Sequence, residues 1–556
     1  MSSVYEIADR FVETYAALSP ISATYMGVPG HDARMNDFSP DGSEAMTAAE
    51  RSAIREMELA VPADERERIC RDTFLEELRL GVEQHEAGEH LRGLNILHSP
   101  VQSCRSVFDM MPRENEEHWS NIAARIELVD WALDSYRASL RLGSDRGSVA
   151  AHGQVRGVAS QLDTWAGVDG SEPFLAGLLN GFDEARHGGT ALKKKLEASA
   201  ERATAAYAEF ARFLRDEYMR VASPQDGVGR ERYALAARSF NGIVLDLEET
   251  YRWGWEQARW VRSEMQKTAD RIKHGATVLD AVELLNTDPA RAIDGVERFK
   301  NWMQELQDTT IADMDGKHFD LDPRVRKIET LIAPPGGALA MYYTGPSEDF
   351  SRPGRTWYPT GGKTAFPIWR EVSIAYHEGV PGHHFQIATN LTLADQLSRY
   401  QRLMAGTSGY TEGWALYAER LMGELGYLEN PDYYMGMLDA QALRSVRVVV
   451  DIGMHLGLKI PQDSAFHPGE TWNGELALAF MRDSVHFPAD FVASEVDRYL
   501  GLPGQAISYK VGERVWLEAR ETARSKAGAR FDLKEWHNAA LRLGPMGLAQ
   551  MKREMG

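Results

Sequence analysis

The chain has 556 residues, of which 43% are hydrophobic and 26% are charged, as in a globular protein with ample material for a large core. Its formal net charge of −20 argues against nucleic acid or an anionic membrane as a partner, because phosphate binding requires clustered Lys and Arg. We recognise no secretory leader and no apolar run long enough to span a membrane, so we expect a cytoplasmic location.

Helical periodicity dominates the first part of the chain, and strand signals are sparse. Apolar residues recur at helical spacing over residues 3–18, 45–87, 115–141, 190–221 and 246–273. Gly, Pro and Asp mark the breaks between these stretches. The pattern predicts a mainly α, multi-helical fold.

The helical pattern of the sequence is interrupted near residue 330. A Pro-Pro-Gly-Gly run at 334–337 precedes a short strand-like run at 338–344, and a turn-rich stretch follows. We expect a small β-sheet here, next to a metal-binding helix, with an edge strand that pairs with an extended peptide. The change separates an N-terminal helical region, 1–329, which forms one wall of a cleft, from a metal-binding catalytic region, 330–556, in one continuous two-lobed unit.

The segment HEGVPGHH, which begins at His377, carries the strongest chemical signal. In a zinc hydrolase two imidazoles hold the metal, and a carboxylate beside the first histidine, here Glu378, activates water at the metal. The usual second histidine stands at i+4, but Pro381 occupies that position, and His383 and His384 follow at i+6 and i+7. Because Gly and Pro oppose a continuous helix, we expect two extra residues to loop out after Glu378 and return a later histidine toward His377.

A second segment, EGWALYAE, begins at Glu412 in a stretch of helical periodicity. Thr411 is a candidate N-cap, which places Glu412 in the first helical turn. A glutamate on a helix packed against the histidine helix is a common third zinc ligand, and the small Gly413 and Ala415 permit close approach. Glu419 follows on the same face and is expected to support the site. The alternative is that Glu412 is a first-turn carboxylate favoured by the helix dipole.

A polar stripe runs through an apolar helical stretch further along the chain. Arg444, Arg447, Asp451 and His455 recur at spacings of 3, 4 and 4, which places them on one face. Such a stripe is either paired internally or lines a cavity. In the functional interpretation, Arg444 or Arg447 clamps a substrate carboxylate and His455 lies near the reacting group. Arg352 is a further candidate for the clamp.

Tyr509 is the candidate for a second stabilising group. It lies in the early turns of a helix that follows a Pro-Gly turn at 503–504. Amide hydrolysis passes through a tetrahedral oxyanion, and a Tyr hydroxyl is a frequent donor to it. The alternative is a structural hydrogen bond, which buried tyrosines commonly make.

Together these segments resemble the bacterial DUF885 family. The resemblance rests on HEGVPGHHFQ from His377, EGWALYAE from Glu412 and PGQAISYKVG from Pro503, and it extends to SRPG, DIGMH and EVDRY at 351–354, 451–455 and 495–499. The last of the three main motifs contains Tyr509. The resemblance implies a largely helical fold related to the gluzincin-type metallopeptidases, and it implies no substrate.

We therefore expect a zinc-dependent hydrolase that cleaves short peptides or peptide-like amides, with one Zn²⁺ ion held by His377, His383 and Glu412. Glu378 takes a proton from water as general base and passes it to the leaving amine. The choice of His383 over His384 rests on analogy with related enzymes, which often place Gly directly before the second histidine. His384 then supports the site or donates to the oxyanion.

Other functions stay open at this point. A metal-dependent hydrolase of a non-peptide amide or ester would use the same ligands. An oxygenase with a two-His-one-carboxylate iron site is a second alternative, although it leaves Glu378 without a task. A non-enzymatic helical binding protein with a vestigial site is a third. A helical shell around a central metal favours short substrates, so we expect an oligopeptidase or carboxypeptidase-like activity, and the oligomeric state stays open.

Overall fold

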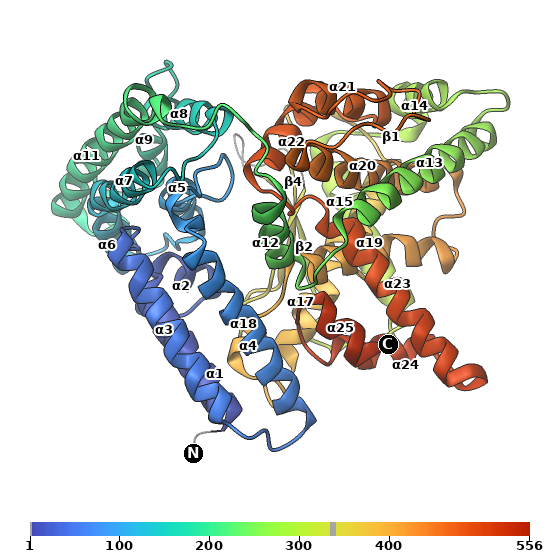
Figure 1. Ribbon diagram of the computed structural model, residues 1–556, viewed down its shortest axis with the longest axis horizontal. Coiled ribbons are helices and arrows are strands. Elements are labelled where there is room, and N and C mark those ends of the chain that lie inside the picture. The colour runs from blue at the N-terminus through green and yellow to red at the C-terminus, as the bar shows by residue number, and fades with distance from the viewer. Residues whose placement is uncertain (1–2, 334–340) are drawn as a thin grey trace. The chain divides into compact units, whose positions relative to one another are not determined.

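The structure, a computed structural model, describes residues 3–333 and 341–556, and it is mainly α-helical, as the sequence predicted (Figure 1). The chain folds into two compact units. Unit 1 comprises Met1–Ala63, Phe74–Gly227 and Leu500–Leu502, and unit 2 comprises Asp64–Thr73, Val228–Tyr499 and Pro503–Gly556.

Most helices that lie wholly or partly in unit 1 come from the first 216 residues. They are α1 (Val4–Leu18), α2 (Pro20–Met26), α3 (Pro40–Leu59), α4 (Glu65–Glu86), α5 (Pro100–Met110), α6 (Glu116–Glu127), α7 (Val129–Asp145), α8 (His152–Ala166), α9 (Phe174–Leu179), α10 (Glu184–His187) and α11 (Gly189–Asp216). The core of this unit forms around α11, where Leu196, Ala203, Tyr207, Phe210 and Leu214 recur at helical spacing and are buried against α5 to α8.

Two predicted helices of this region are each a pair of helices in the structure. The stretch 45–87 contains the end of α3 at Leu59 and the start of α4 at Glu65. Pro62 lies between them, and proline lacks an N–H donor and disfavours helix in the residue before it. The stretch 115–141 likewise contains α6 and α7, while the stretches 190–221 and 246–273 correspond to α11 and α13.

Unit 2 holds most of the remaining helices. They are α12 (Arg230–Asn241), α13 (Leu247–Ile272), α14 (Val278–Thr287), α15 (Val296–Met314), α16 (Glu371–Glu378), α17 (His383–Thr392), α18 (Arg399–Leu403), α19 (Ser408–Glu424), α20 (Pro431–Leu456), α21 (Gly474–Ser484), α22 (Ala489–Gly501), α23 (Ser508–Ala527), α24 (Leu533–Leu541) and α25 (Leu548–Met555).

The packing of α13 explains why residues 228–329 belong to unit 2. Helices α13 and α20 lie side by side (Figure 1), and a Cβ at Gly254 of α13 would lie only 2.8 Å from Val448 Cγ1 of α20. The observed division therefore differs from the one expected at 329/330. The interruption of the helical pattern near residue 330 marks the start of a sheet and not the limit of a packed unit.

The sheet consists of β2 (Ile328–Ile332), β4 (Gly354–Tyr358) and β3 (Tyr342–Thr344), in that order, with β2 parallel and β3 antiparallel to β4. A separate antiparallel pair joins β1 (Ala292–Asp294) to β5 (Ala365–Pro367). Within the described residues β3 is an edge strand, and residues 338–340 of the predicted run lie outside the description. Pairing of this edge with a peptide stays a prediction.

The small sheet lies next to the helix that carries His377, as expected. Tyr358 of β4 shares an apolar cluster with Phe299 of α15 and Ala375 of α16. The Phe299 and Tyr358 rings meet edge to face with centroids 5.9 Å apart. The sheet therefore supports α16 from the side of α15.

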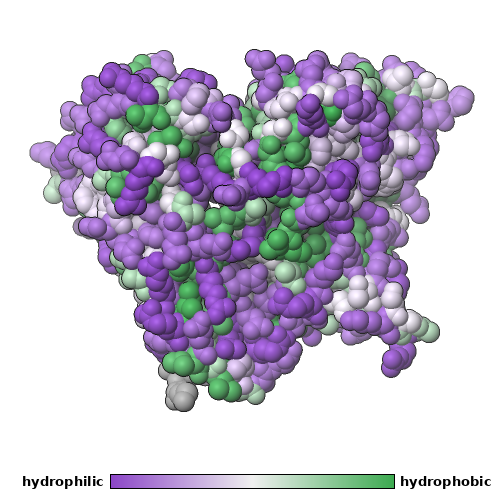
Figure 2. Space-filling view, viewed as in Figure 1, coloured by the Kyte–Doolittle hydropathy of each residue, from purple (hydrophilic) through white to green (hydrophobic). Residues whose placement is uncertain are grey.

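The surface agrees with the composition. The face drawn in Figure 2 is mostly hydrophilic, with small scattered apolar patches. No helix within residues 3–333 and 341–556 is long and apolar enough to cross a membrane.

Helices α19 and α23 run side by side in unit 2 (Figure 1). Gly413 of α19 faces Gly512 of α23, and a Cβ at Gly413 would overlap the Gly512 backbone. The sequence analysis assigned the small Gly413 to close approach of the histidine helix, whereas in the structure it serves the approach of α23.

Replacement of Gly413 by Ala should destabilise the protein. The added methyl group has to push two helix backbones apart, which typically costs about 1–3 kcal/mol in a packed interior. Gly423→Ala is the matched control in the same helix, because the nearest atom to its Cβ would be Leu428 Cδ1 at 3.8 Å. This control should be neutral or stabilising by up to about 1 kcal/mol. Urea unfolding of both variants checks this, and equal midpoints would contradict it.

Candidate metal centre

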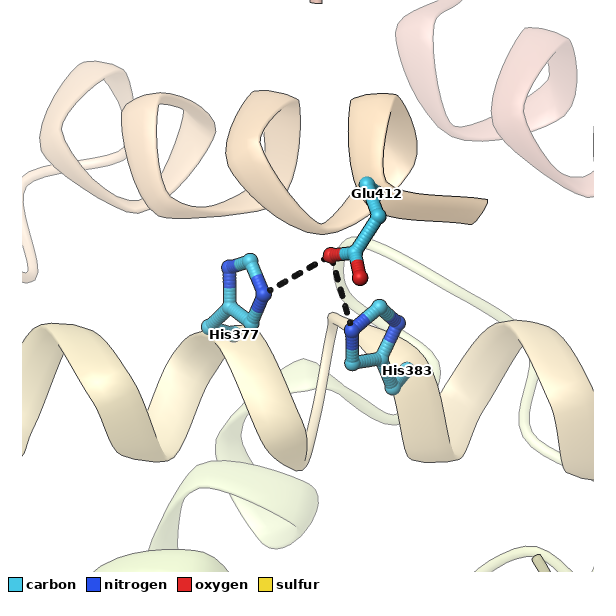
Figure 3. Close-up of side chains that lie close together, drawn as sticks. All are labelled: His377, His383 and Glu412. Carbon is cyan, nitrogen blue, oxygen red and sulfur yellow. Dashed lines mark ion pairs between the residues drawn. The ribbon is translucent and has the colours of Figure 1, made fainter. Parts of the chain in front are cut away.

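Three side chains from three helices of unit 2 converge on one point. His377 lies in the last turn of α16, His383 begins α17, and Glu412 lies on α19 (Figure 3). Glu412 Oε2 is 3.4 Å from Nε2 of His377 and 3.4 Å from Nε2 of His383. One ligand atom from each residue lies within 4.8 Å of the other two. The structure thus brings together the three residues that the sequence analysis named as ligands.

The turn between α16 and α17 makes this convergence possible. α16 ends at Glu378 and α17 begins at His383, so the helix is interrupted and the His377 and His383 rings come to a centroid distance of 4.7 Å. The Gly382 N–H donates to the Tyr376 carbonyl at 2.9 Å, and a Cβ at Gly382 would overlap the His377 carbonyl. Glycine is therefore required at this position, and the expected excursion is present.

A buried tryptophan fixes this turn to the helix of the third ligand. Trp414 Nε1 of α19 donates to the Pro381 carbonyl at 2.8 Å. Trp414 is fully buried and lies two residues after Glu412. Its Nε1 also lies 3.3 Å from the Gly382 carbonyl, so this one side chain holds the turn that places His383 to the helix that places Glu412.

Helix α19 begins earlier than expected. Its N-cap is Thr407, whose hydroxyl accepts from the Tyr410 N–H at 3.3 Å, and not Thr411. Glu412 is then the fifth residue of the helix and lies beyond the first turn. Because the dipole effect falls off within the first turn, the alternative explanation of Glu412 as a dipole-favoured carboxylate loses its basis.

A buried carboxylate sets the proton position on His377. His377 Nδ1 lies 2.8 Å from Glu419 Oε1, and Ser373 Oγ donates to the other Glu419 oxygen. Glu419 is 1% exposed. A histidine that donates from Nδ1 presents the lone pair of Nε2 on its other side, and here that lone pair faces Glu412 Oε2.

Two acceptors that face each other at this distance repel unless a proton or a metal ion lies between them. In the described part of the chain, the buried Glu412 Oε2 and His383 Nδ1 have no hydrogen-bond partner. Two imidazole nitrogens and a carboxylate oxygen are a donor set that zinc prefers. The residues therefore fit a zinc ion with an open coordination position.

The pKa values of His377 and Glu412 also indicate that the cluster favours a positive charge. Burial opposes the charged form of His377, but the nearby Glu412 carboxylate and the hydrogen bond to Glu419 outweigh burial and raise its pKa to about 10. Burial also opposes ionisation of Glu412, yet the nearby imidazoles of His377 and His383 hold its pKa well below the usual value. A proton on His377 is thus the metal-free counterpart of a bound ion.

Glu378 lies at the C-terminal end of α16 and is 9% exposed. Burial raises the pKa of its carboxyl group, while the nearby charges of His377, His383 and Arg444 lower it. A carboxylate of raised pKa is a stronger base than one in water. Its place next to the ligands suits the base role expected from the sequence.

His384 faces away from the cluster. Its Nε2 lies 2.7 Å from the Val325 carbonyl, and its Nδ1 lies 2.9 Å from the Tyr343 hydroxyl of β3. Burial lowers the pKa of His384 to about 4, so the ring is neutral and donates from Nε2 to the carbonyl. Both nitrogens hold α17 to the sheet region, and this geometry does not support the predicted oxyanion role.

Arg447 and His455 take part in internal pairing between α20 and α22. Arg447 Nη2 lies 2.5 Å from Glu495 Oε2, and its Nε donates to the Tyr499 hydroxyl at 2.9 Å. His455 Nε2 lies 3.0 Å from the Tyr499 carbonyl, and burial lowers the pKa of His455 to about 4. For these two residues, the structure therefore supports internal pairing, the first of the two explanations given for the polar stripe.

Tyr509 and Arg444 lie next to the cluster. The Tyr509 ring stacks on the His377 ring at 18°, with centroids 6.3 Å apart. Arg444 Cζ lies 5.5 Å from the Tyr509 ring centroid. Arg498 Nη2 donates to the Tyr509 hydroxyl at 3.4 Å. Arg352 is half-buried, and burial together with the nearby charge of Arg355 lowers its pKa.

Comparison with known proteins places the chain in a family. It matches the family described as "Bacterial protein of unknown function (DUF885)" over residues 20–555. The chain belongs to the DUF885 family. A comparison with curated proteins found no match.

Two solved structures share the fold of this DUF885 protein. The "putative lipoprotein" from Colwellia psychrerythraea is 21% identical, with a TM-score of 0.86, and the similarity covers 99% of this chain and 98% of that one. The "putative lipoprotein of unknown function" from Shewanella oneidensis is 17% identical, with a TM-score of 0.73, and the similarity covers 100% of both chains. At these identities the likeness shows the fold alone.

The sequence analysis missed three residues that shape the site of this DUF885 protein. Ser373 and Tyr343 hold Glu419 and His384 by tertiary hydrogen bonds that no local pattern signals. Arg498, which donates to Tyr509, lies within the EVDRY segment and could have been found there.

Zinc content should separate the two adjacent histidines. His383→Ala removes a ligand and should weaken zinc binding by more than the roughly 10- to 100-fold typical of residues that only orient a ligand. His384→Ala removes a ring that faces the sheet region, so this variant should still bind zinc stoichiometrically. Plasma mass spectrometry after zinc loading, with chelator competition for affinity, measures both. Loss of zinc from the His384 variant alone would reverse the assignment.

Proposed function

We propose that this DUF885 protein is a zinc-dependent hydrolase, and specifically a metallopeptidase that cleaves short peptides or peptide-like amides. The observation that carries the proposal is the convergence of His377, His383 and Glu412 beside the buried carboxylate of Glu378. A zinc ion held by these three ligands supplies Lewis acidity that polarises a carbonyl and acidifies water.

Each protein group then has a task. Glu378 accepts a proton from the attacking water on its carboxylate and delivers it to the leaving amine. Tyr509 donates its hydroxyl proton in a hydrogen bond to the oxyanion that develops on the substrate. The hydrogen bond from Arg498 at 3.4 Å polarises that hydroxyl and makes it a better donor.

The position of Glu378 also bears on the other chemistries. A buried base next to the ligand set supports hydrolysis over the iron oxygenase, in which such a group has no task. A hydrolase of small amides or esters would use the same residues, so the substrate screen includes these compounds together with short peptides.

The cytoplasmic location stays a prediction. The names of the two structural neighbours favour a lipid-anchored protein instead. Fractionation of a native host, followed by detection with an antibody, distinguishes the two locations.

Glu378→Gln should retain zinc and abolish turnover. The amide keeps the shape of the side chain but cannot accept the proton, and general-base catalysis contributes about 10²- to 10⁴-fold in rate. Glu371→Gln is the matched control, since Glu371 opens the same helix and burial also raises its pKa, to about 7. To measure turnover, each zinc-loaded protein is incubated with a mixture of short peptides, and the cleavage products are detected by mass spectrometry. An active Glu378 variant would refute the assignment of the base.

Tyr509→Phe should lower kcat with little change in KM or zinc content. Loss of one oxyanion donor typically costs about 10²- to 10³-fold in kcat. The aromatic ring that stacks on His377 stays in place, so the metal ligands should be undisturbed. Unchanged kcat would mean that the Tyr509 hydroxyl serves only its hydrogen bond with Arg498.

A further inference from the structure

Three arginines surround Tyr509 next to the metal cluster. Cζ of Arg447 lies 4.6 Å and Cζ of Arg444 lies 5.5 Å from the ring centroid, and Arg498 donates to the hydroxyl. Within the described residues, Glu495 is the only carboxylate that forms an ion pair with any of the three. These three arginines and Tyr509 form a wall next to the metal cluster. This wall carries more positive than negative charge, although the net charge of the whole chain is −20.

Two of the three arginines are already paired with a protein carboxylate. Glu495 uses one oxygen for Arg447, at 2.5 Å, and the other for Arg498, at 2.9 Å. Tyr499 accepts a further hydrogen bond from Arg447, and Gln505 accepts one from Arg498 at 2.6 Å. Nη1 of Arg447 and Nε of Arg498 are buried without a partner among the described residues, so what sets these two arginines apart is the ion pair with Glu495, which already supplies each with a carboxylate.

Arg444 differs from both neighbours. It forms no ion pair with any residue that the structure describes, and its one hydrogen bond is a long contact of 3.5 Å from Nη1 to the Ala440 carbonyl of its own helix. Its Nε is buried without a partner in the same part of the chain. The side chain as a whole is half-buried, so the remaining donors reach accessible space. Burial of an unmatched N–H costs free energy, which a bound acceptor would recover.

The position of Arg444 relates it to the bond that is cut. It is among the charges that act on Glu378, and both its guanidinium and the His377 ring lie against the Tyr509 ring. Each residue of an extended peptide spans about 3.5 Å, so a group bound by Arg444 is only a few residues from a carbonyl at the ligands.

We infer that Arg444 binds a carboxylate of the substrate within a few residues of the scissile bond. A guanidinium fork matches a carboxylate in a bidentate geometry, and the surplus charge of the wall favours an anion. The carboxylate is either the free C-terminus of a short peptide or an acidic side chain near the bond. The inference rests on the proposed hydrolase and adds its substrate class.

The experiment compares matched peptide libraries on wild-type, Arg444→Gln and Arg514→Gln proteins loaded with zinc. One library of N-acetylated tetrapeptides has free C-termini, and a second has the same sequences with C-terminal amides. A third, also amidated, carries Glu in place of Gln at each position. Arg514 is the matched control, because it is an arginine of α23 that pairs with Glu249 at 3.0 Å.

The wild type should prefer one carboxylate-bearing library by about 10- to 100-fold in kcat/KM, the range for a charge-assisted hydrogen bond. Arg444→Gln should lose this preference and hydrolyse the matched libraries equally, while Arg514→Gln should retain it. Preference for free C-termini identifies the terminal carboxylate, and preference for Glu-containing amides identifies a side chain. An unchanged preference in the Arg444 variant would overturn the inference.

A binding measurement tests the role of Arg444 independently of hydrolysis. Affinity-selection mass spectrometry of the same libraries is run on Glu378→Gln and on the double variant Glu378→Gln/Arg444→Gln. Selective capture of carboxylate-bearing peptides by the first protein but not the second supports the inference even if the wild type cleaves nothing, which would overturn only the hydrolase. Equal capture by both proteins, or no capture by either, overturns the role of Arg444.

Discussion

The hydrogen bond from Trp414 to the Pro381 carbonyl holds together the two elements on which the metal cluster depends. His377 and His383 are six residues apart, which corresponds to about 9 Å along an unbroken helix and is too far for one ion. The turn after Glu378 brings the two histidines close together. Trp414, which lies on α19 two residues after Glu412, anchors this turn. A shift of either helix would therefore move a ligand relative to the other two.

The position of α19 is in turn set by α23. The contact between Gly413 and Gly512 lets the two backbones approach, and the Trp414 and Trp516 rings pack with centroids 4.8 Å apart. Because α23 also carries Tyr509, the proposed third ligand and the proposed oxyanion donor lie on one tightly packed helix pair. Preorganisation of this kind is what a catalytic group requires.

Local patterns were sufficient for most of the helices and for the convergence of the candidate ligands. The 3.6-residue periodicity located α11, α13 and α20, and the interrupted His-Glu motif gave the excursion that returns His383 to His377. The N-cap at Thr407 was missed because Thr411 offers the same chemistry four residues later. The break after Leu59 was missed because the apolar pattern continues on both sides of Pro62.

Tertiary contacts account for the rest. Adjacent histidines point in opposite directions, since Val325 and Tyr343 hold His384 while Glu412 faces His383. Likewise, Arg444 and Arg447 share a helix face, and only the distant Glu495 determines that one is paired and the other is not. No spacing within the chain encodes such choices.

The pair of carboxylates around His377 has a consequence for the proposed binding of zinc. With Glu419 on one ring nitrogen and Glu412 on the other, the metal-free ring keeps a proton at neutral pH, and that proton serves as a placeholder that preserves the arrangement of the ligands. A zinc ion at the proposed site would replace this proton. Because acid favours the proton, zinc binding there would weaken as the pH falls.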